Sequence, residues 1–513
     1  MINQIWKRYG GVIYFSALFL VMTLFLLPSF SNPPRSDYWS AFYVFQKVDA
    51  SSEPPNWTDI LTFDLWQHGT FRPLSHLVPY LEHKLFGTAF FWNHILNFSA
   101  YCLSIILLYL LALRLSLDKF VTAACLTVYG FLFSHFDILT WTFQLFSLLG
   151  FCSCLLGFII YTTFLKSRRI SSLILIGILF FFGMLCFEVY LLWPIAVLLI
   201  PFALPRPGST SKPKIPLSVV LMLGIIYIIY LGVFFLHRSA PATSGALPVL
   251  TAGETLLAIC MVPFNLFYTG IAVNIFPGLV LPLFYNDNIN LGGLLLNQQQ
   301  HLNTIVLLGG AGGGLIIALG AVWLIRRKER RVFALLLLFF FLYFANFFTL
   351  SLGRLTTDPV FYILSQFRYQ YIPNALLALM AAVVIGNLVR PVRREKIFFI
   401  LILLPILFFN IHIDHKYMGT LENRLKPLRT ILDNISRGIN EKWITADSRL
   451  FIQREAAERL PTPCWNPGMA PFMEGTFQWF FPASEMEKFT LSKEEAVWII
   501  TKDTYWTIQK VKR

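Results

Sequence analysis

The chain has 513 residues, of which 56% are hydrophobic and only 13% are charged, with 51 Phe and 13 Trp. An ordinary soluble domain carries roughly a quarter charged residues, so the composition excludes a disordered chain, a fibrous repeat protein and a simple soluble enzyme. It predicts a polytopic membrane protein. The net charge of +14 does not indicate a nucleic-acid partner, because the basic excess forms short clusters between apolar runs.

Eleven apolar stretches are candidates for membrane-spanning helices, which need about 20 residues each. They cover residues 11–29, 88–113, 120–135, 143–165, 170–187, 189–205, 215–236, 303–325, 332–350, 371–389 and 397–413. The region 254–300 is apolar but interrupted by Pro263, Pro277 and Pro282, and it fits either two further spans or a re-entrant pair. The predicted total is therefore eleven or thirteen spans.

The basic clusters predict the orientation of these spans. With Lys7 and Arg8 in the cytoplasm, nineteen of the 26 basic residues up to Ile413 fall inside and seven fall outside, as the positive-inside rule requires. A long first loop, 30–87, and the tail, 414–513, are then extracytoplasmic. No small-residue cleavage site follows the first apolar run, so we expect a retained helix there.

The predicted fold class is an all-α polytopic membrane protein, with a transmembrane domain over 1–413 and a small C-terminal extracytoplasmic α/β domain over 414–513. The tail shows a helical stretch near 420–437 and a strand candidate at 498–501. Aromatic-rich stretches of the first loop, at 38–48, 57–66 and 74–86, predict amphipathic helices on the membrane face. A Gly-rich run at 309–314 lies in an apolar span, so it indicates close helix packing rather than a phosphate-binding loop.

Three carboxylates lie at the outer ends of the predicted spans, where charged groups are costly and usually functional. Asp37 follows the first span, Asp137 lies in a short loop, and Glu188 lies at a tight turn between two spans. Together with arginines on the same face, they suit proton abstraction beside a phosphate. The alternative for Asp37 and Asp137 is a role as helix caps.

Basic and aromatic candidates lie on the same predicted face. Three arginines are candidate ligands of a donor phosphate: Arg72, Arg354 and Arg368. The alternative for Arg354 and Arg368 is a snorkelling role at the membrane interface. The other pocket candidates are His68, Tyr369 and Tyr371. A lone His is more often a structural hydrogen-bond partner, and tyrosines suit the bilayer interface.

Several strings carry a family resemblance. They are the acidic Asp37 after the first span, the run 71–74 (FRPL), the run 92–97 (WNHILN), the run 137–141 (DILTW), the run 186–190 (CFEVY) and the run 367–373 (FRYQYIP). In this order and on this side of the membrane, the chain resembles the polyprenyl-phosphate-dependent GT-C glycosyltransferases, particularly bacterial relatives of protein O-mannosyltransferases. The resemblance covers roughly residues 10–390. Phe187 stands where the family has a basic residue, and Asp37 stands alone where the family has an acidic pair.

The resemblance implies an inverting glycosyltransferase in the bacterial inner membrane with an active site on the extracytoplasmic face. Asp37 would act as general base on an acceptor hydroxyl, and arginines would hold the lipid phosphate as it leaves. The implied partners are a polyprenyl-phosphate sugar donor, a glycan, lipid or protein acceptor, and the bilayer, with no nucleic acid. No metal ligands are assigned and no cofactor is established by the resemblance, while use of a divalent metal stays open.

Two other functions remain as alternatives. A transporter or flippase for lipid-linked saccharides would have paired halves with matching broken helices, and in the sequence only 254–300 has broken character. A polymerase or ligase of lipid-linked sugars usually carries its large outside loop late in the chain rather than after the first span. The sequence favours the glycosyltransferase and identifies neither the sugar nor the acceptor.

Overall fold

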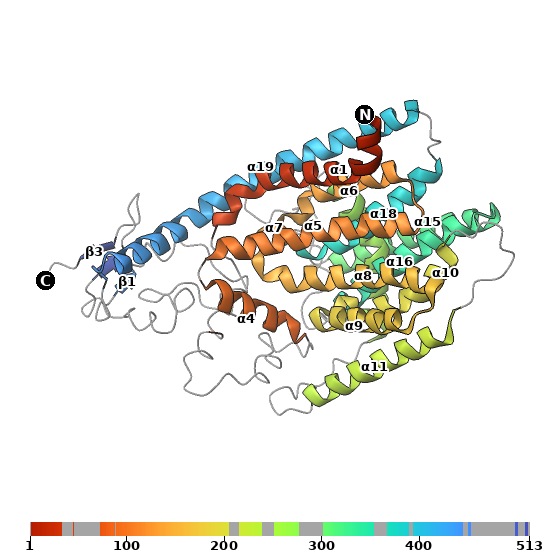
Figure 1. Cartoon of the computed structure of the whole chain (residues 1–513), viewed down its shortest axis with the longest axis horizontal. Helices are drawn as coiled ribbons and strands as arrows, with labels where there is room; N and C mark the ends of the chain where they lie inside the picture. Colours follow the sequence, from red (N-terminus) through yellow and green to blue (C-terminus); the bar gives the residue numbers. More distant parts are fainter. Residues whose placement is uncertain are drawn as a thin grey trace.

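The computed structural model describes residues 2–32, 45, 72–87, 89–204, 215–238, 251–275, 301–352, 367–388, 393–444, 450–452, 498–500 and 508–510. In these residues the chain is almost wholly helical, and its long helices lie side by side as one bundle (Figure 1). Eight helices of the described part are long and apolar enough to cross a membrane, and a bent pair makes a ninth. The prediction of an all-α polytopic membrane protein is confirmed.

The first half of the bundle alternates long helices with short 3-10 turns. Its elements are α1 (Ile2–Leu26), η1 (Leu27–Ser31), α4 (Leu74–Phe86), α5 (Phe90–Arg114), α6 (Lys119–Gly130), η2 (Phe133–His135), α7 (Phe136–Thr140), η3 (Thr142–Gln144), α8 (Leu145–Ser167), α9 (Ile170–Cys186), η4 (Glu188–Tyr190), η5 (Trp193–Leu198) and α10 (Ile200–Ala203). Of the amphipathic helices predicted in the first loop, the stretch 74–86 is confirmed as α4, and 38–48 and 57–66 lie outside the described residues apart from residue 45.

The second half contains longer, less interrupted helices. Its elements are α11 (Leu217–Arg238), α12 (Ala252–Phe267), the π-helical turn η7 (Tyr268–Val273), α15 (Leu302–Arg326), α16 (Arg330–Leu352), η9 (Phe367–Tyr369), α18 (Tyr371–Leu388), α19 (Arg393–Asn440), β1 (Leu450–Ile452), β2 (Trp498–Ile500) and β3 (Ile508–Lys510). Figure 1 shows α4 and the three strands toward one end of the bundle, at the left of the view.

The span predicted over 120–135 is broken in the structure. Helix α6 ends at Gly130, and the chain resumes with η2 and α7 at an angle of 60°. The backbone N–H of Phe133, the first residue of η2, donates to Asn410 Oδ1 over 2.9 Å. Non-helical backbone at membrane depth persists only where such groups are satisfied by the protein or by water in a cavity.

The span predicted over 189–205 is also not one continuous α-helix. It is built from η4, η5 and the four-residue α10, and Pro194 and Pro201 stand in the first turns of η5 and α10. Proline removes a backbone donor and clashes with the preceding turn. A regular helix through this stretch is therefore interrupted, and Glu188 begins a 3-10 turn.

The C-terminal span and the first helix of the tail are a single element. Helix α19 has 48 residues and runs from the predicted span at 397–413 through the predicted helix at 420–437. In the tail, β1 pairs parallel with β2, and β2 pairs antiparallel with β3. The predicted strand at 498–501 is confirmed as β2, and a separate α/β domain over 414–513 stays a prediction.

Two glycines allow neighbouring elements of the bundle to pack closely. A Cβ atom on Gly310 of α15 would lie 2.2 Å from the carbonyl oxygen of Cys260 on α12, so the prediction of close packing in this Gly-rich run is confirmed. A Cβ atom on Gly150 of α8 would lie 2.7 Å from the ring of Tyr190. The absence of a side chain at Gly150 therefore lets η4 lie directly against α8.

Candidate functional site

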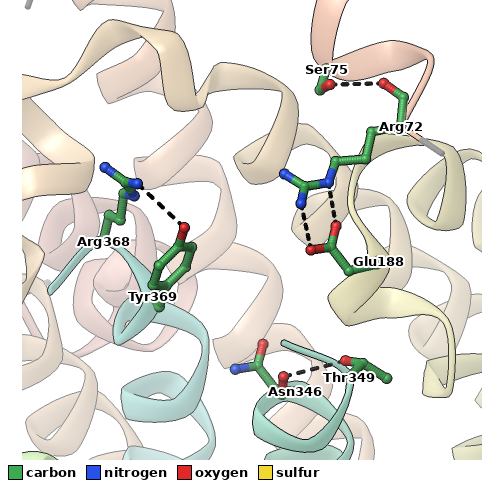
Figure 2. A network of polar contacts seen from close by, with 7 residues as sticks. All are labelled: Arg72, Ser75, Glu188, Asn346, Thr349, Arg368 and Tyr369. Carbon is green, nitrogen blue, oxygen red and sulfur yellow. Dashed lines mark hydrogen bonds and ion pairs between the residues drawn. The ribbon is translucent and has the colours of Figure 1, made fainter. Parts of the chain in front are cut away.

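Arg72 and Glu188 form an ion pair between the start of α4 and the turn η4. The guanidinium donates from Nη2 to Glu188 Oε1 over 2.7 Å, and Nε lies 2.5 Å from Oε2, so the carboxylate faces the fork of the arginine (Figure 2). The two side chains are 13% and 14% exposed. This parallel arrangement is the geometry that makes Arg–carboxylate pairs strong and directional.

Local structure fixes both members of the pair. The carbonyl of Arg72 accepts hydrogen bonds from the backbone N–H and the hydroxyl of Ser75, at 2.9 and 2.8 Å. Glu188 follows Phe187, whose extended backbone ends α9, and begins η4. The chain therefore leaves the α-helical conformation directly before Glu188, and the Glu188 side chain stands at the start of a turn.

Arg368 lies on the aromatic side of the same region. Its guanidinium carbon lies 4.0 Å from the ring centre of Trp141 and 5.1 Å from that of Tyr369. Its Nη2 also donates to the Tyr369 hydroxyl over 3.3 Å (Figure 2). Aromatic faces attract guanidinium groups, and the attraction grows when both are desolvated.

One aromatic contact joins the two arginines. The guanidinium carbon of Arg72 lies 4.9 Å from the ring centre of Phe187, and the Phe187 ring stacks on Tyr369 with centres 6.4 Å apart. A continuous row of aromatic faces thus runs from Arg72 to Arg368. We call Arg72, Trp141, Phe187, Glu188, Arg368 and Tyr369 the two-arginine site.

A buried amide lies on α16, the helix that packs against η4. Figure 2 shows Asn346 of α16 in the same region; its backbone carbonyl accepts from the Thr349 hydroxyl over 3.3 Å. The Asn346 side chain is 1% exposed, and neither its oxygen nor its nitrogen has a hydrogen-bond partner among the residues that the structure describes. An amide of this kind is available to a hydroxyl-bearing ligand.

Tyr371 follows the two-arginine site in the chain and is buried in the bundle. Its side chain is 1% exposed, and its hydroxyl lies 2.7 Å from Ser147 Oγ and 3.1 Å from the Tyr190 hydroxyl. Tyr190 in turn donates to the Ser147 carbonyl over 2.7 Å. These contacts join η4, which carries Glu188, to α8 and to α18, the helix that follows Arg368.

The remaining predicted residues are placed as follows. Asp137 stands in the first turn of α7, half-buried, and α7 packs against η9, which carries Arg368. Asp37, His68 and Arg354 lie outside the described residues. The structure therefore brings together Arg72, Glu188, Arg368 and Tyr369 of the predicted set.

The sequence interpretation missed two members of the site. Trp141 and Phe187 supply the aromatic faces on which the arginines lie. Both stood in the strings that carried the resemblance, and Phe187 appeared there only as a departure from the family pattern. The replacement of the family's basic residue by Phe187 was the signal available in the sequence. An aromatic ring at this position can bind the guanidinium of an arginine from another part of the chain.

No metal cluster is present in the part of the chain described here: no three His, Cys, Asp or Glu side chains converge there. One further buried carboxyl was not predicted. Glu82 of α4 is 2% exposed, and burial raises its pKa to about 8, while the nearby Asn93 amide acts in the opposite direction. Glu82 therefore holds a proton at neutral pH.

The comparisons with known proteins give weak matches. No protein-family model matches the chain, and the search of the curated proteins returns no match. Among solved structures, the chain is similar to the oligosaccharyltransferase of Archaeoglobus fulgidus tethered to an acceptor peptide, with 14% identity and a TM-score of 0.39. It is also similar to the oligosaccharyltransferase AglB of that organism in complex with an inhibitory peptide and a dolichol-phosphate, with 13% identity and a TM-score of 0.39.

Both matches are partial. They cover 81% of this chain and 56% of each oligosaccharyltransferase, so the chain spans about half the length of the structures it matches. At this similarity no residue role is carried over from them. The chain itself is a polytopic membrane protein in which two arginines lie against aromatic rings at breaks between helices.

Proposed function

We propose that this protein is an integral membrane glycosyltransferase that moves a sugar from a polyprenyl-phosphate donor to an envelope glycan, lipid or protein on the extracytoplasmic face. The observation that carries the proposal is the two-arginine site: two guanidinium groups share one row of aromatic rings in a bundle of apolar helices. Such a site suits an anionic headgroup on a lipid whose tail stays in the bilayer.

Arg368 is the proposed ligand of the donor phosphate, together with Arg354. Its guanidinium is oriented by Trp141 and Tyr369. As the bond between the anomeric carbon and the phosphate oxygen breaks, negative charge develops on the phosphate. A guanidinium already in place stabilises that charge without reorganisation.

Arg72 keeps its predicted role toward the donor, but with only part of its guanidinium. Its Nε and Nη2 face Glu188, so Nη1 is the part of its fork that we assign to the donor. Glu188 is then a positioning residue that holds Arg72, rather than the group that accepts a proton. Both oxygens of Glu188 face the fork of Arg72, so we assign the proton-accepting role to another carboxylate.

The general base is assigned to Asp37, and Asp137 of α7 is the second candidate. The base takes the proton of the acceptor hydroxyl, the hydroxyl oxygen attacks the anomeric carbon with inversion, and the lipid phosphate leaves. His68 is proposed to line the same pocket. The buried amide of Asn346, without a partner among the described residues, fits recognition of a sugar hydroxyl.

The testing experiment measures sugar transfer by the purified full-length protein in nanodiscs. Polyprenyl-phosphate sugars and diphosphate-linked oligosaccharides are offered as donors, and mass spectrometry detects the product. Transfer from the monophosphate donor that depends on Arg368 supports the proposal. Transfer only from diphosphate-linked donors would favour a polymerase or ligase, and the proposal would then be wrong.

One observation keeps the transporter alternative in view. The broken pair α6–α7 and the π-helical turn after α12 meet where the Ser134 hydroxyl donates to Asn274 Oδ1 over 2.9 Å. Interrupted helices that meet at membrane depth are typical of transporters. Movement of a lipid-linked saccharide across vesicles without any sugar transfer would favour this second function.

A further inference from the structure

The turn that joins α15 to α16 is strongly basic and lies at the opposite end of the bundle from α4. Within residues 326–331, five are basic and one, Glu329, is acidic, and all six are exposed. Figure 1 shows this turn at the right of the view, whereas α4 and the strands lie at the left. Helix α5 runs between the two ends with 25 residues, a length of about 37 Å. That length crosses the hydrocarbon core of a bilayer.

Arg331 joins this turn to the neighbouring turn between α5 and α6. Its Nη2 donates to the carbonyl oxygens of Leu115 and Ser116 over 2.7 and 3.1 Å. Its Nε donates to the carbonyl oxygen of Ala203, the last residue of α10, over 3.4 Å. One guanidinium therefore binds the ends of two other helices and holds the two turns side by side.

The turn between α5 and α6 adds two exposed basic residues, Arg114 and Lys119. Its one acidic residue, Asp118, caps α6 by accepting a hydrogen bond from the Val121 N–H over 2.9 Å. The Asp118 carboxylate is thus already engaged within the chain. We call the exposed basic residues of the two turns, other than Arg331, the basic face: Arg114, Lys119, Arg326, Arg327, Lys328 and Arg330.

Internal contacts do not account for Lys328 and Arg330. Neither side chain has a hydrogen bond or an ion pair with any residue that the structure describes. Arg330 is the first residue of α16, where a cation opposes the helix dipole and lowers stability. These two charges are therefore free to bind an anion from outside the chain.

Trp323 of α15 places the basic face at the boundary of the bilayer. Its side chain is 49% exposed, and the guanidinium carbon of Arg327 lies 4.4 Å from its ring centre. Leu319 and Ile325 are exposed on the same part of α15. Tryptophan is enriched at the depth of lipid headgroups, so the basic face lies at headgroup level and the exposed apolar side chains of α15 lie beside acyl chains.

We propose that the basic face binds an anionic phospholipid of the adjoining leaflet. The phosphate oxygens accept hydrogen bonds from the exposed guanidinium and ammonium groups, and the acyl chains lie along the exposed apolar side chains of α15. Charge complementarity selects this occupant: a cluster of about four to eight Lys and Arg beside a membrane helix attracts acidic lipids, whereas a zwitterionic headgroup has no net charge. This binding is independent of the two-arginine site and of sugar transfer.

The test uses the full-length protein, delipidated in detergent and offered equal amounts of phosphatidylglycerol and phosphatidylcholine. Native mass spectrometry counts the lipids retained. The wild type should retain phosphatidylglycerol over phosphatidylcholine by about tenfold or more, because each Lys or Arg beside an anionic lipid strengthens binding about fivefold. The double variant Lys328→Gln/Arg330→Gln should lower that ratio by about fivefold or more.

Two controls separate this surface from net charge and from a site for free anions. Lys426→Gln/Arg437→Gln removes one Lys and one Arg from exposed positions of α19, and it should keep the wild-type ratio. An excess of inorganic phosphate at constant ionic strength should leave phosphatidylglycerol bound, because free phosphate has no acyl chains to hold it at the bilayer boundary.

Four results would overturn the proposal. They are equal retention of the two lipids by the wild type, an unchanged ratio in Lys328→Gln/Arg330→Gln, an equal fall of the ratio in both double variants, or displacement of phosphatidylglycerol by inorganic phosphate. If the first double variant fails to fold, Arg330→Gln alone replaces it, since this change removes a charge that opposes the helix dipole. A wild-type ratio in that single variant would equally exclude the basic face as the binding site.

Discussion

The hydroxyl groups of Tyr190 and Tyr371 lie 3.1 Å apart, and this contact joins the turn that carries Glu188 to the helix that follows Arg368. Both hydroxyls also bond to Ser147 of α8. The two halves of the two-arginine site therefore rest on one buried hydrogen-bonded cluster. A change in that cluster should alter the site without touching a ligand.

Tyr371→Phe removes the hydroxyl that links Ser147 and Tyr190. We expect a loss of about 1–2 kcal/mol in unfolding free energy, because buried partners lose a hydrogen bond, and a drop of up to about tenfold in transfer rate. Thermal unfolding and initial rates measure both effects. Tyr161→Phe is the matched control: that hydroxyl is buried without a partner among the described residues, so its removal should cost neither stability nor rate.

Arg368→Lys keeps a positive charge but loses the planar fork that lies over Trp141. A lysine point charge cannot grip two phosphate oxygens, so kcat/KM for the lipid donor should fall about 10- to 100-fold, and further in Arg368→Ala. Acceptor KM should change little. Arg429→Lys, at an exposed position on α19, provides the control, and a defect confined to acceptor binding would contradict the phosphate role.

Glu188→Gln and Asp37→Asn distinguish the positioning residue from the base. Loss of a general base costs about two to four orders of magnitude in rate, which we expect for Asp37→Asn with normal membrane insertion. Glu188→Gln keeps a hydrogen-bond acceptor for Arg72, so its loss should be smaller and the pH profile of kcat should keep its shape. The opposite order of defects would make Glu188 the base.

Glu82 should make stability depend on pH. Because burial raises its pKa from 4.5 to about 8, the folded state keeps a proton that the unfolded chain loses, and this group's contribution to stability falls as pH rises through that interval. Gln at position 82 cannot ionise. The unfolding free energy of Glu82→Gln should therefore rise relative to that of the wild type as the pH increases from about 5 to about 8. Melting curves at several pH values test this, with the exposed Glu329→Gln as control. A constant difference across pH would contradict it.

The predicted orientation places the turn at 326–331 in the cytoplasm and the loop 30–87 outside. In intact cells, an impermeant thiol reagent should label Ser52→Cys and should label Glu329→Cys only after permeabilisation. Labelling of Glu329→Cys in intact cells would reverse the topology. The proposed extracytoplasmic active site would then be wrong.

The sequence by itself determined the class of the protein and the position of most helices. Apolar runs of spanning length have no stable place in water, so stretches such as 88–113 and 303–325 correspond closely to α5 and α15. It also placed Arg72, Glu188 and Arg368 at helix ends, because charged residues interrupt apolar runs only where they can be solvated or paired.

Only the tertiary structure decided which of these groups meet. Arg72 and Glu188 are 116 positions apart in the chain, yet they form one ion pair. Likewise, the Phe133 N–H at the break after Gly130 bonds to the distant Asn410. No local sequence pattern predicts either contact, because each forms only when helices that are distant in the sequence pack together. Asp414 likewise looked like the first polar residue after a span, and only the packing of α1 and α7 against α19 encloses it in a pocket.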